Sequence, residues 1–137
     1  MNIILLAGPE KKGKTPTLDM VYAQLAQNMQ NPPQKQQIKG VLTDDFESSP
    51  LLHNGKTVAI FSLGDTKYQV DDAIKKYGGI VDVLIIACRT GFKWSNALIA
   101  NFQGSPNNCV IQKTVVNTSN LETQANTQDC QTIISKI

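Results

Sequence analysis

Residues Gly8 to Thr15 concentrate the chemistry of this 137-residue chain. They read GPEKKGKT, which is glycine, four intervening residues, then glycine, lysine and threonine. Glycines let the backbone curl until successive N–H groups point inward, and a following helix adds its unpaired N–H groups and the positive end of its dipole. Such a loop is suited to a nucleotide's phosphates. The alternative is a lysine-rich turn that matches by chance, at odds of about one in a hundred or less.

The motif resembles the Walker A sequence of P-loop NTPases at every position. The resemblance implies that Lys14 reaches the β- and γ-phosphates and that the hydroxyl of Thr15 ligates Mg²⁺. It also implies a cofactor-binding segment made of Gly8, Pro9, Glu10, Lys11, Lys12, Gly13, Lys14, Thr15 and Pro16. Pro16 falls in the first helical turn, where no intrahelical N–H is needed. The expected ligand is ATP, or another nucleoside triphosphate, with Mg²⁺.

The motif requires a strand before it and a helix after it, and the pattern predicts both. Residues 3–7 form an apolar run that ends at glycine, typical of a buried parallel strand. Apolar residues from Lys14 onward recur at helical spacing until Asn31-Pro32-Pro33 interrupts them. The face they form consists of Leu18, Val21, Tyr22, Leu25 and Met29.

The rest of the chain alternates between predicted strands and helices. Strands are expected at 37–42 (weakly), 57–62, 81–88 and 109–116, with an Asn54-Gly55 hairpin turn before the second. Helices are expected around 66–77, ending at Gly78-Gly79, around 94–102, and from Ser119, where Glu122 completes a capping box. The last helix should bury Leu121, Ala125, Cys130, Ile133, Ile134 and Ile137. This order predicts a three-layer α/β/α P-loop fold with a mainly parallel, about five-stranded sheet, in one domain over 1–137.

Phosphoryl chemistry also needs an acidic group near Mg²⁺ and a group that stabilises developing charge. Asp65 follows the predicted strand at 57–62 and is the candidate for a water-mediated Mg²⁺ partner and a catalytic residue, although Asp65 or Thr66 also suits the N-cap of the next helix. Arg89, the only arginine, follows the most apolar strand. It is either a catalytic charge stabiliser, together with Lys14, or a structural ion-pair partner.

Several residues near this edge have two interpretations. Asp44, Asp45 and Glu47 follow the weak second strand, where they form either an acceptor or general-base site or a solvated loop. His53 abuts the Asn-Gly turn and is expected at the surface. Phe92 and Trp94 either stack on a nucleobase or cover the core.

The sequence lacks features that three classes of nucleotide-binding protein need. A single arginine does not supply the lid and acceptor-helix arginines of nucleoside monophosphate kinases. The segment QKTVVNT at 112–118 lacks the Asn-Lys-x-Asp element with which Ras-like GTPases recognise guanine. The chain is also too short for the helical lid of an AAA-type ATPase.

Composition points to a soluble cytoplasmic protein. The net charge of +2 is spread without runs, so no nucleic-acid or membrane surface is indicated. Three dispersed cysteines favour reduced thiols over disulfides or a zinc site. The short N-terminal apolar run lacks the basic start and cleavage pattern of a signal peptide.

Three functions follow from these patterns. The first is an ATP-binding protein that hydrolyses or transfers phosphate. The second is a nucleotide-sensing module without turnover, acting on a protein partner or within a homo-oligomer. The third is a small-molecule kinase that uses Asp44 or Asp45 at the acceptor site.

Overall fold

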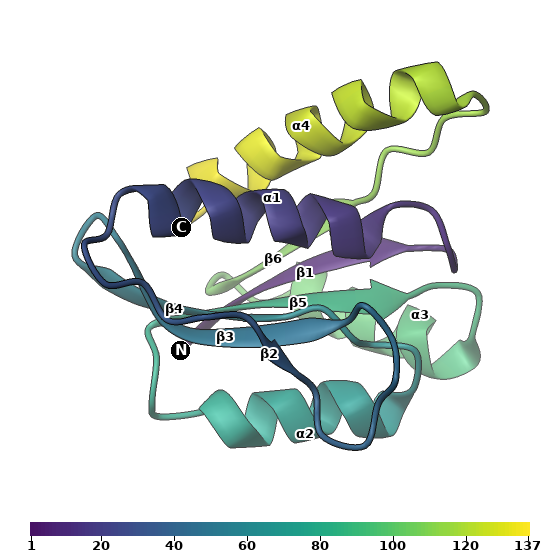
Figure 1. The fold of residues 1–137 in the computed structure, drawn as a ribbon. Helices are drawn as coiled ribbons and strands as arrows, with labels where there is room; N and C mark the ends of the chain where they lie inside the picture. The colour runs from purple at the N-terminus through teal and green to yellow at the C-terminus, as the bar shows by residue number, and fades with distance from the viewer.

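A computed structural model describes all residues from Met1 to Ile137 and shows an α/β protein with six strands and four helices (Figure 1). In chain order the elements are β1 (Asn2–Gly8), α1 (Lys14–Gln27), β2 (Gln36–Gln37), β3 (Phe46–His53), β4 (Lys56–Phe61), α2 (Lys67–Tyr77), β5 (Val83–Arg89), α3 (Lys93–Gln103), β6 (Asn108–Gln112) and α4 (Ser119–Ser135). None of the helices combines the length and hydropathy needed to cross a bilayer.

The strands form one mixed sheet in the order β2-β3-β4-β5-β1-β6. Strands β4, β5, β1 and β6 run parallel, whereas β3 pairs antiparallel with β4, and β2 antiparallel with β3. The predicted sheet of about five mainly parallel strands is therefore corrected to a six-stranded mixed one. The β3–β4 pair is antiparallel because a two-residue turn joins the two strands, and such a turn reverses the chain.

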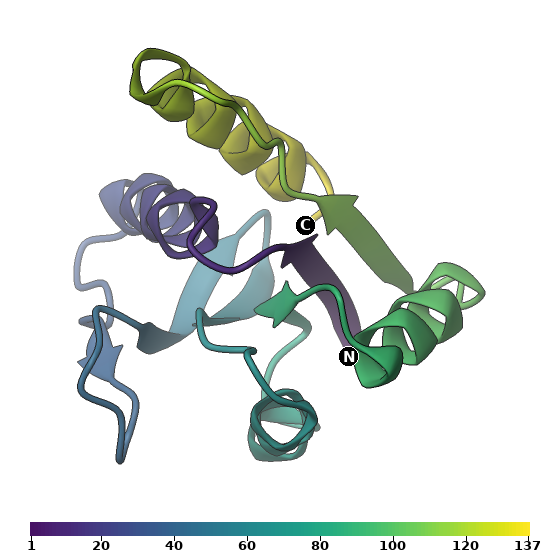
Figure 2. The same cartoon turned by 90° about the vertical axis from the view of Figure 1, so that its right-hand side faces the viewer.

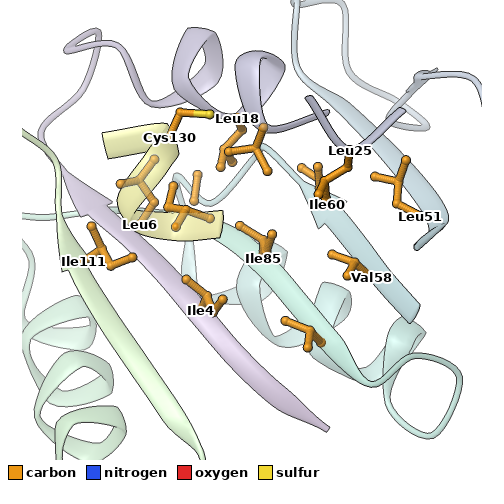
Figure 3. Packing of buried hydrophobic residues seen from close by; sticks show 14 of the residues in the cluster. Ile4, Leu6, Leu18, Leu25, Leu51, Val58, Ile60, Ile85, Ile111 and Cys130 are labelled. Carbon is orange, nitrogen blue, oxygen red and sulfur yellow. The ribbon is translucent and has the colours of Figure 1, made fainter. Parts of the chain in front are cut away.

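Helices cover both faces of the sheet. Helices α1 and α4 lie side by side on one face, and α2 and α3 lie on the other, as the two views at right angles show (Figures 1 and 2). Alternate residues of β1 therefore enter different cores: Ile4 and Leu6 face α1 and α4 (Figure 3), while Ile3 and Leu5 face α2 and α3. Because both its faces are buried from Ile3 onward, β1 is apolar from Ile3 to Ala7.

Several predicted elements are confirmed, and each has a strong local signal. Helix α1 buries Leu18, Val21 and Leu25, which are three of the five residues predicted to form its apolar face. The Asn54-Gly55 turn has positive φ at both residues, 49° and 78°, as a type I′ hairpin turn requires. Strand β5 lies in the interior of the sheet, hydrogen-bonded to β4 and β1.

Other boundaries were wrong. The strand expected at 37–42 is limited to Gln36–Gln37, and residues 38–42 turn instead. Strand β3 was not predicted, and it begins within the expected acidic loop. Strand β6 ends at Gln112, short of the predicted Val116.

The predicted start and buried face of the last helix also need correction. Helix α4 has Thr118 as N-cap without a capping hydrogen bond, and Leu121 is exposed rather than buried. Helix α2 ends at Gly78-Gly79 as predicted, with Gly79 in the left-handed region at a φ of 76°.

The parallel strands determine where functional residues can come together. The loops that follow β1, β4, β5 and β6 all emerge at the carboxyl edge of the sheet, where ligands of α/β proteins bind. The antiparallel strand β3 starts at this same edge, because its first residues pair with the end of β4. Five segments distant in sequence thus meet there.

Candidate functional site

The segment between β1 and α1 is a curled loop rich in free backbone donors. The N–H groups of the six consecutive residues from Glu10 to Thr15 make no hydrogen bond within the protein, and the first helical N–H to do so is that of Thr17. Gly13 adopts a left-handed φ of 92°, a conformation that glycine adopts without strain. The loop and the start of α1 therefore present an array of unpaired donors beside the positive end of a helix dipole.

Lys14 is the first residue of α1 and is 8% exposed. Its Nζ atom donates to the carbonyl oxygens of Gly8 at 2.9 Å and Pro9 at 2.6 Å, so the side chain folds back along its own loop. Burial lowers the pKa of Lys14, and the nearby Asp65 carboxylate opposes that shift. An anion in the loop would favour the charged form and offset the cost of burying it.

Thr15 contacts a carboxylate that arrives from a distant segment. Its hydroxyl donates to Oδ1 of Asp45 at 2.8 Å, and the same oxygen accepts from the Ser62 hydroxyl at 3.1 Å. The other oxygen of Asp45 accepts from the Thr43 hydroxyl at 2.8 Å. Asp45, expected either at an acceptor or general-base site or in a solvated loop, is thus the carboxylate that touches the hydroxyl expected to ligate Mg²⁺.

Asp65 lies in the loop between β4 and α2, where its side chain is free. Thr66, not Asp65, is the N-cap of α2 and forms a capping box with Gln69, so the alternative role for Asp65 is wrong. The Asp65 carboxylate accepts no hydrogen bond from the protein, whereas its backbone N–H donates to Gln69 Oε1 at 2.9 Å. This backbone hydrogen bond helps to place a carboxylate without protein donors near Lys14.

These groups line one cavity of about 830 Å³ at the carboxyl edge of the sheet. The cavity extends from the loop, past Asp45 and Asp65, to Asp19, Lys35, Thr43 and Asp44. Phe46 is its one hydrophobic lining residue. A cavity of this size lined by lysines, carboxylates and free amides is suited to a polar, charged ligand rather than an apolar one.

Arg89 lies beside this cavity and does not line it. Its register position is opposite Gly8, and its Nη2 atom donates to Oε2 of Glu10 at 2.8 Å. The guanidinium also lies over the ring of Phe92, 5.1 Å from the ring centroid. The structure thus shows the ion pair that was one of the two predicted roles of Arg89, with Glu10 of the loop between β1 and α1 as its partner.

The acidic cluster divides between the two faces of the sheet. Asp44 and Asp45 lie at the cavity, but Glu47 is buried on the α2 side, where it accepts hydrogen bonds from Tyr77 and Lys76. The solvated-loop interpretation is therefore wrong for Glu47. His53 ends β3 at the far hairpin, away from the cavity, with Nε2 at 3.3 Å from Asn54 Nδ2.

A buried polar network behind the loop was not predicted. Lys113, which follows β6, pairs with Asp129 of α4 at 2.8 Å, with side-chain exposures of 1% and 6%. A Cβ atom at Gly8 would lie 2.7 Å from Cβ of Lys113, and one at Gly13 would lie 2.7 Å from Oδ1 of Asn126. Both loop glycines are therefore needed for close packing against this network.

The sequence does contain a signal for this network. Asn126 and Asp129 lie one helical turn apart on the face of α4 that also buries Ala125, Cys130 and Ile133. Polar residues on a buried face must find hydrogen-bond partners, so their spacing could have marked them as a structural or functional network.

No cluster of three or more His, Cys, Asp or Glu side chains could hold a metal ion by itself. The oxygen donors of Thr15 and Asp45 are nevertheless the kind of ligand that Mg²⁺ prefers when phosphates complete its coordination. Comparison of the chain with protein-family models, with curated proteins and with solved structures finds no match, so the site must be interpreted from its own geometry.

Proposed function

We propose that the chain is a P-loop protein that binds a nucleoside triphosphate, with ATP as the first candidate, together with Mg²⁺. The observation that carries the proposal is the run of six N–H groups from Glu10 to Thr15 without protein acceptors, beside the buried ammonium of Lys14. Curled backbone donors at a helix start bind phosphate. The proposal includes the finer description of the fold, in which β1, the glycine loop and α1 form a P-loop unit.

Mg²⁺ fits the residues present at Thr15. This cation uses hard oxygen ligands, keeps several waters and is usually held by one or two carboxylates plus substrate phosphates. Thr15 supplies a hydroxyl, and Asp45 supplies a carboxylate 2.8 Å from it. Bound Mg²⁺ would neutralise charge on the phosphate oxygens. In this proposal Asp45 takes the metal-supporting role that sequence analysis assigned to Asp65.

Asp65 is then available to position the attacking water. Its carboxylate lies in the same cavity as the loop and close enough to Lys14 to influence the pKa of that lysine. In hydrolysis, a water oxygen bonds to the γ-phosphorus while the bond to the bridging oxygen breaks, and the water proton leaves for a base or a phosphate oxygen. Asp65 would orient that water and accept its proton.

Calorimetry with ATP tests the binding step. The wild-type chain should bind ATP with Mg²⁺, and Lys14→Ala should weaken binding more than about tenfold because a charge-assisted hydrogen bond to phosphate is lost. Lys12→Ala is the matched control, since Lys12 is an exposed lysine of the same loop. Lys12→Ala should weaken ATP binding less than Lys14→Ala does. Unchanged affinity in Lys14→Ala would show that the assignment is wrong.

Phosphate release separates an enzyme from a sensing module. If the wild type releases phosphate from ATP, Asp65→Ala should slow release by about a hundredfold or more while ATP still binds. If neither protein releases phosphate although ATP binds, the sensing function is favoured. One contact supports that second function: the bond from Thr15 to Asp45 connects the nucleotide loop to the start of β3.

A kinase function is favoured by the extent of the cavity beyond the loop. Asp19, Lys35, Thr43 and Asp44 line a region that lies outside the loop and provide polar contacts for a second substrate. Asp44 is exposed there and would orient an acceptor hydroxyl. A screen of hydroxyl-bearing metabolites for a phosphorylated product tests this function. Product formation that persists in Asp44→Asn would argue against the assigned residue.

A further inference from the structure

We propose that Arg89, Phe92 and Trp94 form a nucleobase-binding platform, so that the ligand is a nucleoside triphosphate rather than an inorganic polyphosphate. The inference rests on the proposed phosphate-binding function of the loop. Phe92 and Trp94 stack with a centroid separation of 6.1 Å and an interplanar angle of 12°. The Cζ atom of Arg89 lies over the ring of Phe92, 5.1 Å from its centroid.

The platform adjoins the phosphate loop through three contacts. Arg89 is opposite Gly8 in the β1–β5 pairing, and the N–H of Thr90 donates to the Gly8 carbonyl at 3.0 Å. Arg89 also donates to Glu10, which lines the cavity. In Figure 1 the segments after β1 and after β5 reach the same end of the molecule. A ligand whose phosphates lie in the loop can therefore extend its base toward Arg89.

The stack is held in place before any ligand arrives. The Ser95 hydroxyl donates to the carbonyl of Phe92 at 2.9 Å and accepts from its N–H at 3.2 Å, which fixes the backbone that carries the ring. Ser95 itself is fully buried. Trp94 packs against the core on the α2 and α3 side of the sheet. A preformed platform binds without the entropic cost of ordering its side chains.

The chemistry of the stack suits a base. The Arg89 guanidinium lies over the Phe92 ring and donates to Glu10, and 30% of the Arg89 side chain stays exposed, which leaves surface on which a base would stack. Guanidinium and aromatic planes bind nucleobases through their π-faces, with little dependence on which base is present. Phe92 is 38% exposed, which is a large exposed fraction for an aromatic ring, and a stacked ligand would cover part of this surface.

Calorimetry that compares ATP with inorganic tripolyphosphate, both with Mg²⁺, tests the platform. The wild type should bind ATP about tenfold more tightly than tripolyphosphate, because only ATP carries a base that stacks. Phe92→Leu removes the ring and keeps an apolar side chain, and Arg89→Lys keeps the charge near Glu10 and removes the plane. Both variants should lose the ATP advantage while their tripolyphosphate affinity stays at the wild-type value. Phe92→Tyr is the matched control and should keep the advantage.

Each other outcome has a defined meaning. Equal wild-type affinities for the two ligands, or an ATP advantage that survives in either variant, would overturn the platform while leaving phosphate binding intact. If a variant loses affinity for ATP and for tripolyphosphate equally, the substituted residue supports phosphate binding rather than base stacking. This outcome would also overturn the platform. If the wild type binds neither ligand, the proposed function itself fails, and the platform fails with it.

Discussion

The carboxylate of Asp45 accepts a hydrogen bond from the hydroxyl of Thr15, 30 residues away in sequence, at 2.8 Å. The same carboxylate accepts from Ser62 and Thr43, so three hydroxyl groups fix its position. Ser62 follows β4, and its N–H and hydroxyl also bond the backbone of Phe46. The start of α1, the end of β4 and the start of β3 are thereby joined at one carboxylate, to which the proposed function assigns the support of Mg²⁺.

Asp45→Asn should reduce the Mg²⁺-dependent part of ATP binding. The substitution keeps the size of the side chain and removes its charge, and loss of a residue that supports a metal ligand commonly costs about tenfold to a hundredfold in metal affinity. Calorimetry measures the affinity for ATP once in Mg²⁺ and once in EDTA, and the ratio of the two affinities gives the Mg²⁺-dependent part. Asp44→Asn is the neighbouring control and should leave that ratio near the wild-type value. A ratio unchanged in Asp45→Asn would exclude the metal-supporting role.

The sequence predicts the segment that contains Thr15 but not the contact of Thr15 with Asp45. The curled loop between β1 and α1, helix α1 and strand β5 were predictable because their signals are local: a glycine-containing motif, a helical stripe and an unbroken apolar run. The contact from Thr15 to Asp45 was not, because it depends on β3, whose apolar pattern is interrupted by Ser48, Ser49 and Pro50. A register irregularity between Ser48 and Leu51 accompanies that interruption. The same limit hid Lys113 and Asp129, which meet only after β6 and α4 pack together.

Gly64→Ala should destabilise the chain by about 3 kcal/mol or more, because the site tolerates no side chain. A Cβ atom at Gly64 would lie 1.7 Å from the backbone oxygen of Ala87 in β5, and neither backbone can yield locally. The N–H of Arg89 donates to the Gly64 carbonyl at 2.9 Å, so the loop carrying Asp65 would be displaced from β5. Denaturant unfolding measures the loss of stability.

Gly104→Ala is the matched control for this substitution. Gly104 ends α3 with an ordinary φ of −81°, and an added Cβ would meet its nearest atom at 3.6 Å. The free energy of unfolding should change by less than about 1 kcal/mol. Equal effects of the two substitutions would contradict the close approach of Gly64 to β5.

Lys113→Met should destabilise the chain by about 3 to 5 kcal/mol, because it leaves the buried carboxylate of Asp129 without its cation. Methionine retains the unbranched chain that packs against Gly8 and Gly13, so packing changes little. Asp129 would keep two donors, the N–H and the hydroxyl of Thr114 at 2.8 and 2.7 Å. The double variant Lys113→Met with Asp129→Leu should recover part of the stability, since it removes the unpaired charge.

The exposed pair of Lys67 and Asp71 is the control for that measurement. Both side chains are more than half exposed, and they lie four residues apart on α2. Lys67→Met should change the free energy of unfolding by less than about 0.5 kcal/mol in denaturant titrations. If Lys113→Met costs no more than Lys67→Met, the buried pair does not stabilise the segment behind the phosphate loop.

Cys88 should make the stability of the chain fall at alkaline pH. Burial raises the pKa of this thiol from 9.0 to about 11, and the positive charge of Lys14 opposes the shift only in part. The folded state therefore keeps its proton above pH 9, where the unfolded chain has released it. Unfolding is thus favoured progressively as the pH rises from about 9 to about 11, and up to about 2 to 3 kcal/mol of stability is lost across that window.

Cys88→Ala removes this titration, so the comparison between pH values identifies the thiol. At about pH 8 the variant reports only the small cavity left by the sulfur, because the thiol is protonated in both states there. Between about pH 8 and about pH 11 its stability should fall less than that of the wild type, by about 2 to 3 kcal/mol. Tyr77, whose pKa is raised by burial and by Glu47, contributes equally to both proteins and cancels in the difference. Parallel pH profiles for the two proteins would mean that Cys88 ionises as readily in the folded chain as in the unfolded one, and that the carboxyl end of β5 is not closed to water.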